Sequence, residues 1–301
     1  MTLTGRAEHA TARNAALASV GVAGGLTLLK AGAAWATGSV AVLGSFADSG
    51  LDLVASLITL GGVAWAARPA DNDHRFGHGK AEALAALAQA ALMIASVGLI
   101  AWAAAHRLAS PAPPAEPTIA IAVSAVAIAV TLALLGLQRR AIDATNSVAI
   151  RSDRAHNRAD LAVNIAVIVA VGLEAFAGLS GADALFGLGI AAWLGLSGAR
   201  AGSEAIDLLM DKEWPEAQRQ RLLCVAAAHP LVRGVHDLRT RGSGQHHFAQ
   251  FHIWVDPDMT VGDAHDVVDA VEACVRRAFP GVGVLVHVDP TGHRDQRPPH
   301  G

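Results

Sequence analysis

Two pairs of potential metal ligands stand four residues apart within apolar stretches of the chain. Asp48 and Asp52 lie in "AVLGSFADSGLDLVASLITL", and His156 and Asp160 lie at the start of "AHNRADLAVNIAVIVAVGLEAF". Because an α-helix completes a turn every 3.6 residues, each pair lies on one face of its helix. Three carboxylates and one imidazole can complete a tetrahedral shell around a divalent cation such as Zn²⁺. The spacing therefore predicts a four-ligand metal site between two helices.

A structural role for these charges is the competing interpretation. Arg154 and Arg158 could pair with Asp160 at the start of a helix. However, an acidic residue inside an apolar span costs a few kcal/mol and is a functional candidate by default. The apolar stretch around Asp48 and Asp52 contains no Lys or Arg that could neutralise them. Two such pairs on separate helices favour a metal site.

The composition indicates a membrane protein. Of the 301 residues, 52% are hydrophobic and only 16% are charged, whereas soluble domains carry about 25% charged residues. The net charge of −3 gives no basic surface for nucleic acid. A helix needs roughly 20 apolar residues to cross a bilayer. Six stretches meet this length, at about 15–37, 40–67, 81–105, 118–137, 159–179 and 183–209. The first lacks a small-residue cleavage site, so we expect it to remain as a span and not to act as a signal peptide.

The start of the fifth span is open to two interpretations. Hydropathy alone starts it near Ala159, which leaves His156 at the water interface. Alternatively, one long helix begins near Thr145, and its charged first turns face other helices or a water-filled cleft. Hydropathy does not choose between them.

The distribution of Lys and Arg predicts the orientation. These residues flank the first span and fill the loops after the second, fourth and sixth spans, as Arg6, Arg13, Arg68, Arg75, Lys80, Arg139, Arg140, Arg151, Arg154 and Lys212. Basic loops face the cytoplasm. We therefore expect a multi-pass protein of the cell (inner) membrane with both termini in the cytoplasm.

From about Asp211 the sequence becomes polar and its pattern changes. The order of elements is helix, strand, strand, helix, strand over about 80 residues, which is typical of a small α/β domain with two helices on one sheet. The expected organisation is a membrane domain at 1–209, a cytoplasmic domain at 210–290 and a disordered tail at 291–301. Cys224 and Cys274 form no disulfide framework, in keeping with a reducing compartment.

Two further groups of residues could bind metal. Asp71, His74 and His78 lie in the loop after the second span, where the alternative is a solvated turn that caps the third. In the polar domain, adjacent strands could bring several His residues and one Asp together on one side of the sheet, with a further His on the second helix. These residues are His236, His252, His287, Asp289 and, on the helix, His265.

Four segments, "GSFADSGLDLVAS", "FGHGKAEALAAL", "AHNRADLAVN" and "GVHDLRTRGSG", occur in this order, and together they resemble the cation diffusion facilitator family, in particular its bacterial zinc/cadmium/iron exporters. The resemblance implies six transmembrane α-helices followed by a C-terminal cytoplasmic ferredoxin-like α/β domain. It implies that Asp48, Asp52, His156 and Asp160 form a transport site that opens alternately to either side. It also implies a loop site at Asp71, His74 and His78 and a binuclear cytoplasmic site at His236, His252, His265, His287 and Asp289. Finally, it implies a homodimer held by a charge interlock of Lys80 and Asp211.

The expected function is export of a divalent cation from the cytoplasm in exchange for protons, by alternating access. An imidazole among carboxylates suits Zn²⁺ first and Cd²⁺ next, with Fe²⁺ a further candidate. In the cytoplasmic domain, Zn²⁺ would be structural or regulatory. One alternative is a metal-sensing scaffold anchored by its helices. A membrane metalloenzyme is disfavoured, because four ligands leave no open coordination position and no HExxH motif is present, so we expect no enzyme activity.

Overall fold

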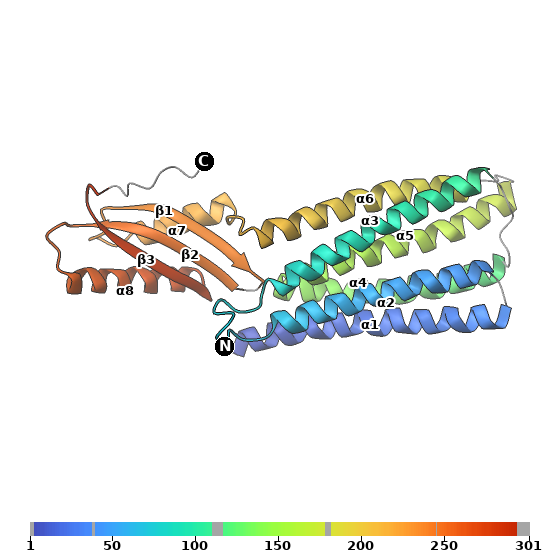
Figure 1. Cartoon of the computed structure of the whole chain (residues 1–301), viewed down its shortest axis with the longest axis horizontal. Helices are drawn as coiled ribbons and strands as arrows, with labels where there is room; N and C mark the ends of the chain where they lie inside the picture. The colour runs from blue at the N-terminus through green and yellow to red at the C-terminus, as the bar shows by residue number, and fades with distance from the viewer. Residues whose placement is uncertain (1–2, 38–39, 110–116, 178–181, 245, 294–301) are drawn as a thin grey trace. The chain divides into compact units, whose positions relative to one another are not determined.

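The chain divides into two compact units, Met1–Leu209 and Met210–Gly301, in a computed structural model that describes residues 3–37, 40–109, 117–177, 182–244 and 246–293. Figure 1 labels the helices and strands of both units. Most of the tail predicted to be disordered, residues 294–301, lies outside the described part of the chain.

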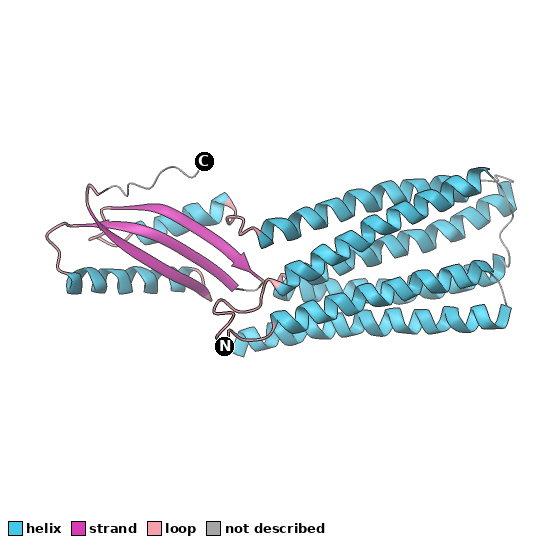
Figure 2. Cartoon of the chain, viewed as in Figure 1, coloured by secondary structure: helices cyan, strands magenta, loops and turns pink. Residues whose placement is uncertain are grey.

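The first unit is an all-helical bundle, as Figure 2 shows. Its six helices are α1 (Leu3–Thr37), α2 (Val40–Ala66), α3 (Ala81–Ala109), α4 (Pro117–Thr145), α5 (Val148–Ala177) and α6 (Ala182–Leu209). Within the described residues, four segments are long and apolar enough to cross a membrane, namely Ala10–Gly32, Ser49–Ala66, Ala81–His106 and Ile121–Thr145. The predicted helical membrane domain is confirmed.

Helix α5 begins well before the point at which hydropathy placed it. Its first residue is Val148, so the start near Ala159 is wrong, and His156 lies inside the bundle with 7% of its surface exposed. Glu82, which is buried on α3, explains the start. Its Oε2 accepts hydrogen bonds from Ser147 Oγ at 2.7 Å and from the Val148 backbone N–H at 3.1 Å. A carboxylate at a helix N-terminus stabilises otherwise unpaired N–H groups, and this contact between distant residues does not appear in a hydropathy profile.

Small residues bring the helices close together. Gly62 on α2 faces Ala85 on α3, and a Cβ on Gly62 would lie only 2.3 Å from the Ala85 Cβ. Close backbone approach at small residues is the usual way in which helices associate in lipid, where the hydrophobic effect between helices is weak. The Gly62–Ala85 contact thus fixes α2 against α3.

The second unit is the predicted α/β domain, with the element order confirmed. It comprises α7 (Glu216–Ala227), β1 (Gly234–Ser243), β2 (His246–Val255), α8 (Val261–Ala278) and β3 (Val282–Pro290). The strand order is β1-β2-β3, with β1 antiparallel and β3 parallel to the central β2. One hydrophobic core contains side chains of both helices and of β2, among them Leu222, Phe251 and Val271.

The alternation of side chains along β2 gives the sheet two different faces. Ala249, Phe251, Ile253 and Val255 are buried in the core that includes the helices. Since successive residues of a strand point to opposite faces, His252 lies on the face away from this core. The face of the sheet that carries His252 is therefore the one turned away from the helices.

Candidate metal centres

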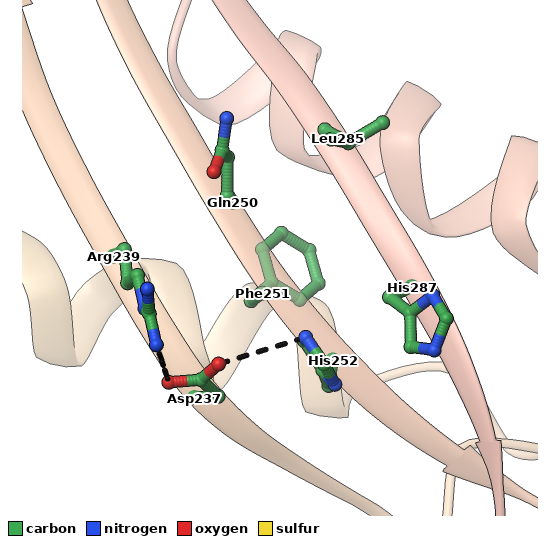
Figure 3. Close-up of a pocket in the computed structure, with 7 residues that line it drawn as sticks. All are labelled: Asp237, Arg239, Gln250, Phe251, His252, Leu285 and His287. Carbon is green, nitrogen blue, oxygen red and sulfur yellow. Dashed lines mark hydrogen bonds and ion pairs between the residues drawn. The ribbon is translucent and has the colours of Figure 1, made fainter. Parts of the chain in front are cut away.

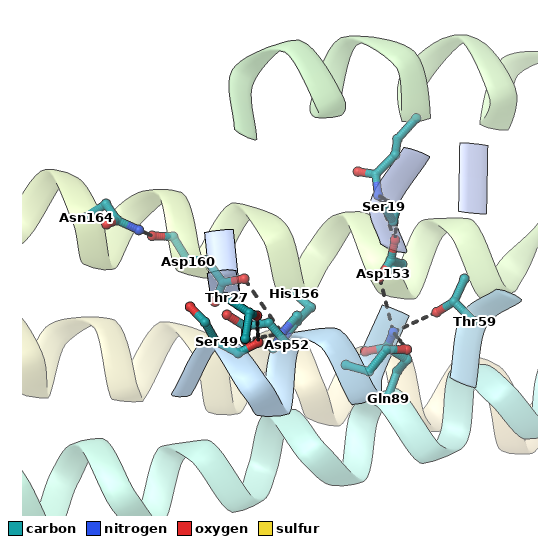
Figure 4. A network of polar contacts seen from close by, with 12 residues as sticks. Ser19, Thr27, Ser49, Asp52, Thr59, Gln89, Asp153, His156, Asp160 and Asn164 are labelled. Carbon is teal, nitrogen blue, oxygen red and sulfur yellow. Dashed lines mark hydrogen bonds and ion pairs between the residues drawn. The ribbon is translucent and has the colours of Figure 1, made fainter. Parts of the chain in front are cut away.

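A cluster of three potential metal ligands, Asp52, His156 and Asp160, joins α2 and α5 inside the helical bundle, and we call it the metal cluster. The potential ligand atoms of Asp52, His156 and Asp160 all lie within 4.8 Å of one another. His156 Nε2 lies 3.1 Å from Asp52 Oδ1 and 3.6 Å from Asp160 Oδ2, and Figure 4 shows the three side chains converging. The Asp48 side chain lies outside the part that the structure describes, although its backbone is one turn before Asp52 on α2.

The separations in this cluster fit a small divalent cation. Bonds of about 2.0–2.1 Å in a tetrahedral arrangement place neighbouring N and O ligands about 3.3 Å apart, close to the observed 3.1 and 3.6 Å. One imidazole and two carboxylates form a mixed nitrogen and oxygen set that suits Zn²⁺ and similar metals. The arrangement can therefore hold such an ion with little rearrangement of these side chains.

A buried lysine, which was not predicted from the sequence, faces the same site. Lys30 on α1 is 8% exposed and lines a small cavity together with Asp52 and Asp160. The second span contains no Lys or Arg, whereas the helix bundle places Lys30 of the first span near its carboxylates. The available signal was a single Lys within "GGLTLLKAGAAW", because a charge inside an apolar span usually faces the bundle interior.

A second polar group, also not predicted from the sequence, surrounds the fully buried Asp153 of α5. Asp153 Oδ2 accepts hydrogen bonds from Ser19 Oγ and Gln138 Nε2, both at 2.7 Å, and Asp153 Oδ1 accepts one from Gln89 Nε2 at 3.2 Å. Gln89 also bonds Thr59 Oγ1 at 2.7 Å. Figure 4 shows this group beside the metal cluster. Polar residues inside otherwise apolar spans were the available signal.

The loop between α2 and α3 gathers its three predicted ligands. His74 Nδ1 and His78 Nε2 each lie 3.4 Å from an oxygen of Asp71. The backbone N–H of His74 donates to Asp71 Oδ1 at 2.6 Å, and this bond is the main reason that the pKa of Asp71 falls below its ordinary value. Asp71 and His74 are exposed, whereas only 7% of the His78 side chain is. The cluster is open to solvent on one side.

In the second unit, three histidines form a row across the sheet. His236 pairs with His252 in the β1–β2 register, and His252 pairs with His287 in the β2–β3 register. Asp289 holds the row together. Its Oδ2 lies 3.1 Å from His236 Nε2 and 2.9 Å from His252 Nδ1, while its Oδ1 lies 3.3 Å from His287 Nε2. Neighbouring strands thus bring the predicted residues to one face of the sheet.

The pKa of Asp289 lies below its ordinary value. Burial raises the pKa, but the hydrogen bond with His252 and the charges of His287, His252 and His236 outweigh that effect. Asp289 is only 3% exposed. Its carboxylate is therefore kept ionised and ready to act as a ligand.

A β-bulge adds Asp237, which was not predicted. The register shifts between His236 and Arg239, and Asp237 has a φ of 46°. This distortion brings Asp237 Oδ2 to 3.6 Å from His252 Nε2, although neighbouring residues of a regular strand point to opposite faces. Figure 3 shows Asp237 between Arg239 and His252, with His287 on the other side of His252.

The roles expected of His265 and of the interlock between Lys80 and Asp211 also stay predictions. His265 on α8 lies 3.7 Å from Asp269 with 73% of its side chain exposed, and it does not belong to the group of His236, His252 and Asp289 in the described part of the chain. For the expected interlock, Lys80 Nζ donates to the Leu209 carbonyl at 3.1 Å in the first unit. Asp211 Oδ2 lies 3.7 Å from Arg241 Nη1 in the second.

Comparisons with known proteins identify the family of the chain. Residues 16–210 match the family model of the cation efflux transmembrane domain, and residues 214–291 match that of the cation efflux protein cytoplasmic domain. The cation-efflux pump FieF of Salmonella paratyphi A is 40% identical over 276 residues, which cover 92% of each chain, and the same values hold for FieF of Salmonella agona.

Solved structures are similar over a smaller part of the chain. A zinc-form structure of CzrB is 33% identical and covers 29% of this chain and 100% of its own, with a TM-score of 0.26. A structure of the MamM CTD is 37% identical and covers 25% of this chain and 96% of its own, with a TM-score of 0.24.

Two family models therefore account for nearly the whole chain, and the FieF relatives are similar over 92% of it. Members of this family are transporters and not enzymes, which confirms that expectation and removes the metalloenzyme alternative. The chain belongs to the cation diffusion facilitator family and is a multi-pass membrane protein of the cation efflux type.

Proposed function

We propose that the protein exports Zn²⁺ from the cytoplasm in exchange for protons, with Cd²⁺ and Fe²⁺ as further substrates. The observation that carries the proposal is the cluster of Asp52, His156 and Asp160 inside a helical membrane domain. Asp48, one turn before Asp52, completes the proposed ligand set.

The choice of metal depends on His156. An imidazole among carboxylates favours Zn²⁺ and Cd²⁺, whereas an all-oxygen set favours Mn²⁺. The ligand separations of 3.1 and 3.6 Å support an ion with short bonds. Ca²⁺ prefers six to eight oxygen ligands at longer distances, and this cluster does not offer them.

Proton exchange follows from the chemistry of the ligands. Imidazole and carboxylate groups must be deprotonated to bind metal, so protons and metal compete for the same atoms. Protons that enter from outside displace the metal there, and metal binds again from the cytoplasm after the site has reoriented. Transport by alternating access thereby couples metal efflux to proton influx.

The proposal includes a location and an assembly. Basic loops indicate cytoplasmic termini and a protein of the inner membrane. The protein acts as a homodimer, with Lys80 and Asp211 as the interlock at the membrane face. In the cytoplasmic domain, His236, His252 and Asp289, together with His265 and His287, bind regulatory Zn²⁺ that draws the two subunits together. The loop cluster of Asp71, His74 and His78 is the third site.

Transport in proteoliposomes tests the proposal. Zn²⁺, Cd²⁺, Fe²⁺ and Mn²⁺ are each offered with and without an imposed pH gradient, and the Asp52→Ala variant serves as the inactive control. We expect Zn²⁺ flux that increases with the gradient and is lost in the variant. Flux indifferent to the gradient would contradict proton exchange, and intact zinc resistance in cells that carry Asp52→Ala would favour the metal-sensing scaffold.

A further inference from the structure

We propose that Asp153 is a releasable latch that closes the path between the metal cluster and one end of the helical bundle. The inference rests on the proposed function, since a latch has meaning only where the site must open to each side in turn. We define the latch layer as Asp153 with its partners, Ser19, Thr59, Gln89 and Gln138.

The latch layer lies between the metal cluster and the bundle end that carries the connection from α2 to α3. On α5, Asp153 is three residues before His156, on the side of the helix start at Val148. On α2, Thr59 is seven residues after Asp52, on the side of the helix end at Ala66. Both directions lead to the same end of the bundle, which we call the loop end.

The cavity beside the metal cluster extends in the opposite direction. It is lined by Asn164, which follows Asp160 on α5, and by Lys30, in the second half of α1. In this conformation the metal cluster borders a cavity on one side and the latch layer on the other.

The latch layer is closed to water. Asp153, Thr59, Gln89 and Gln138 each have 0% of their surface exposed, and Ser19 has 1%. The donors come from α1, α3 and α4, and the carboxylate comes from α5, while Thr59 adds α2. One side chain on α5 therefore connects it to α1, α3 and α4 and, through Gln89, to α2.

The partners of Asp153 have other acceptors nearby, so the latch layer can separate by breaking only the hydrogen bonds to Asp153. Gln89 Nε2 has two hydrogens and three acceptors, of which the Ala55 carbonyl at 2.9 Å and Thr59 Oγ1 at 2.7 Å remain on α2. Ser19 Oγ can turn to the Ala15 carbonyl at 3.2 Å, and Gln138 Nε2 retains Ser19 Oγ at 3.1 Å. The hydrogens of Gln89 Nε2 and Ser19 Oγ thus keep acceptors after α5 moves away.

Only the Asp153 carboxylate loses all its hydrogen-bond donors, namely Ser19, Gln89 and Gln138. The movement of α5 away from these residues also lets water reach the carboxylate. A carboxylate is strongly hydrated, whereas a buried carboxylate without partners costs several kcal/mol. Separation of the latch layer and hydration of the Asp153 carboxylate therefore occur together. The latch holds while the layer is dry and is easily released once water enters from the loop end.

An amide in place of this carboxylate should weaken the latch without a change in size. In Asp153→Asn, the amide NH2 group replaces either the oxygen that accepts from Gln89 or the oxygen that accepts from Ser19 and Gln138, so it meets a donor in either orientation. The double variant Asp153→Asn with Gln138→Glu reverses donor and acceptor, so that the amide introduced at position 153 can donate to the new carboxylate. This exchange restores the pairing and moves the charge from α5 to α4.

The experiment measures access to the loop end. Cys224 and Cys274 are changed to Ser, and Ala16→Cys provides a reporter at a position with 0% exposure on α1, one turn from Ser19 toward the loop end. A membrane-impermeant maleimide is added from that side to the full-length protein in liposomes. Leaving buried donors unpaired costs about 1–3 kcal/mol, so we expect labelling roughly tenfold faster or more in Asp153→Asn. The rate should return to within about twofold of the parent in the exchanged pair.

Asp153→Ala provides a second opening variant, and we expect its labelling rate to rise above that of the parent as in Asp153→Asn. Unchanged labelling in both single variants would overturn the latch, as would equally fast labelling in the exchanged pair. Labelling requires no metal flux. Failure of the parent protein to transport metal would therefore contradict the proposed function, while the labelling rates would still test the latch independently.

Discussion

His156 Nε2 on α5 lies 3.1 Å from Asp52 Oδ1 on α2, so the metal cluster bridges two helices that belong to distant parts of the sequence. Neither helix contributes a complete set of ligands. A bound cation would therefore restrain α2 against α5, and loss of the cation would allow them to separate. Under the proposed function, cation binding and the separation of α2 from α5 are therefore linked.

Removal of one carboxylate from this bridge should abolish transport. Asp52→Ala leaves the cluster without its only described ligand from α2. We expect zinc flux to fall by more than about 100-fold, beyond the 10–100-fold typical of outer-shell partners. Stopped-flow measurements with a zinc-sensitive dye inside proteoliposomes would check this. Asp143→Asn, at an exposed position on α4, is the matched control and should transport normally; an active Asp52→Ala would exclude this cluster as the transport site.

Exchange of the imidazole for a carboxylate should change the metal preference. His156→Asp makes the described cluster all oxygen, which suits Mn²⁺ better than Zn²⁺. Competition between the two metals for transport should shift toward Mn²⁺ by about tenfold or more, equal to 1.4 kcal/mol of relative binding. Unchanged Zn²⁺ and Cd²⁺ transport in this variant would show that the ligand type does not select the metal.

Neutralisation of the buried lysine should tighten metal binding and slow release. Lys30 lines the cavity that contains Asp52 and Asp160, and its positive charge opposes a divalent cation there. At an effective dielectric constant of about 20, Lys30→Met should raise zinc affinity by roughly tenfold and lower kcat. Lys30→Arg retains the charge and is the control. Equal zinc affinity in Lys30→Met and the parent, measured by calorimetry in detergent, would contradict this role.

Asp289 should stabilise the metal-free α/β unit in a pH-dependent manner. Its pKa is lowered in the folded state, so its contribution is present above the unfolded-state pKa and is lost as the pH falls through the folded-state pKa. With an unfolded value of about 3.9, the contribution is complete above roughly pH 5. Asp289→Asn should therefore lower the free energy of unfolding at pH 7, and the deficit should shrink below about pH 4.

Urea unfolding of residues 210–301 in the presence of a chelator measures this difference, because the unit has its own hydrophobic core. Asp269→Asn, which removes an exposed partner of His265, is the control. A deficit that is the same at both pH values would mean that Asp289 acts through packing and not through its charge.

The sequence predicted the groups of potential ligands whose members lie within a single loop, helix or strand. Asp71, His74 and His78 share a short loop, and His156 and Asp160 share one helix face. The alternation of β2 placed His252 on the polar face. In each case local geometry is sufficient, since the periods of helix and strand are fixed.

The features that it did not predict depend on contacts between elements. Glu82 caps α5 from another helix and sets its start at Val148. Lys30 and Asp153 acquire their surroundings only when the bundle forms, because their partners come from other helices. The bulge at Asp237 is a change of register that no alternation pattern contains.

The bulge at Asp237 offers a way to alter the group formed by His236, His252 and Asp289. Asp237, inserted beside His236, supplies an acidic neighbour to His252 that a regular strand would direct to the other face. Deletion of this one residue would return β1 to uniform pairing and leave the hydrophobic core unaltered. If the sheet binds metal as proposed, one deletion at position 237 would both shorten β1 and remove an acidic neighbour of His252, and would thereby change the metal affinity.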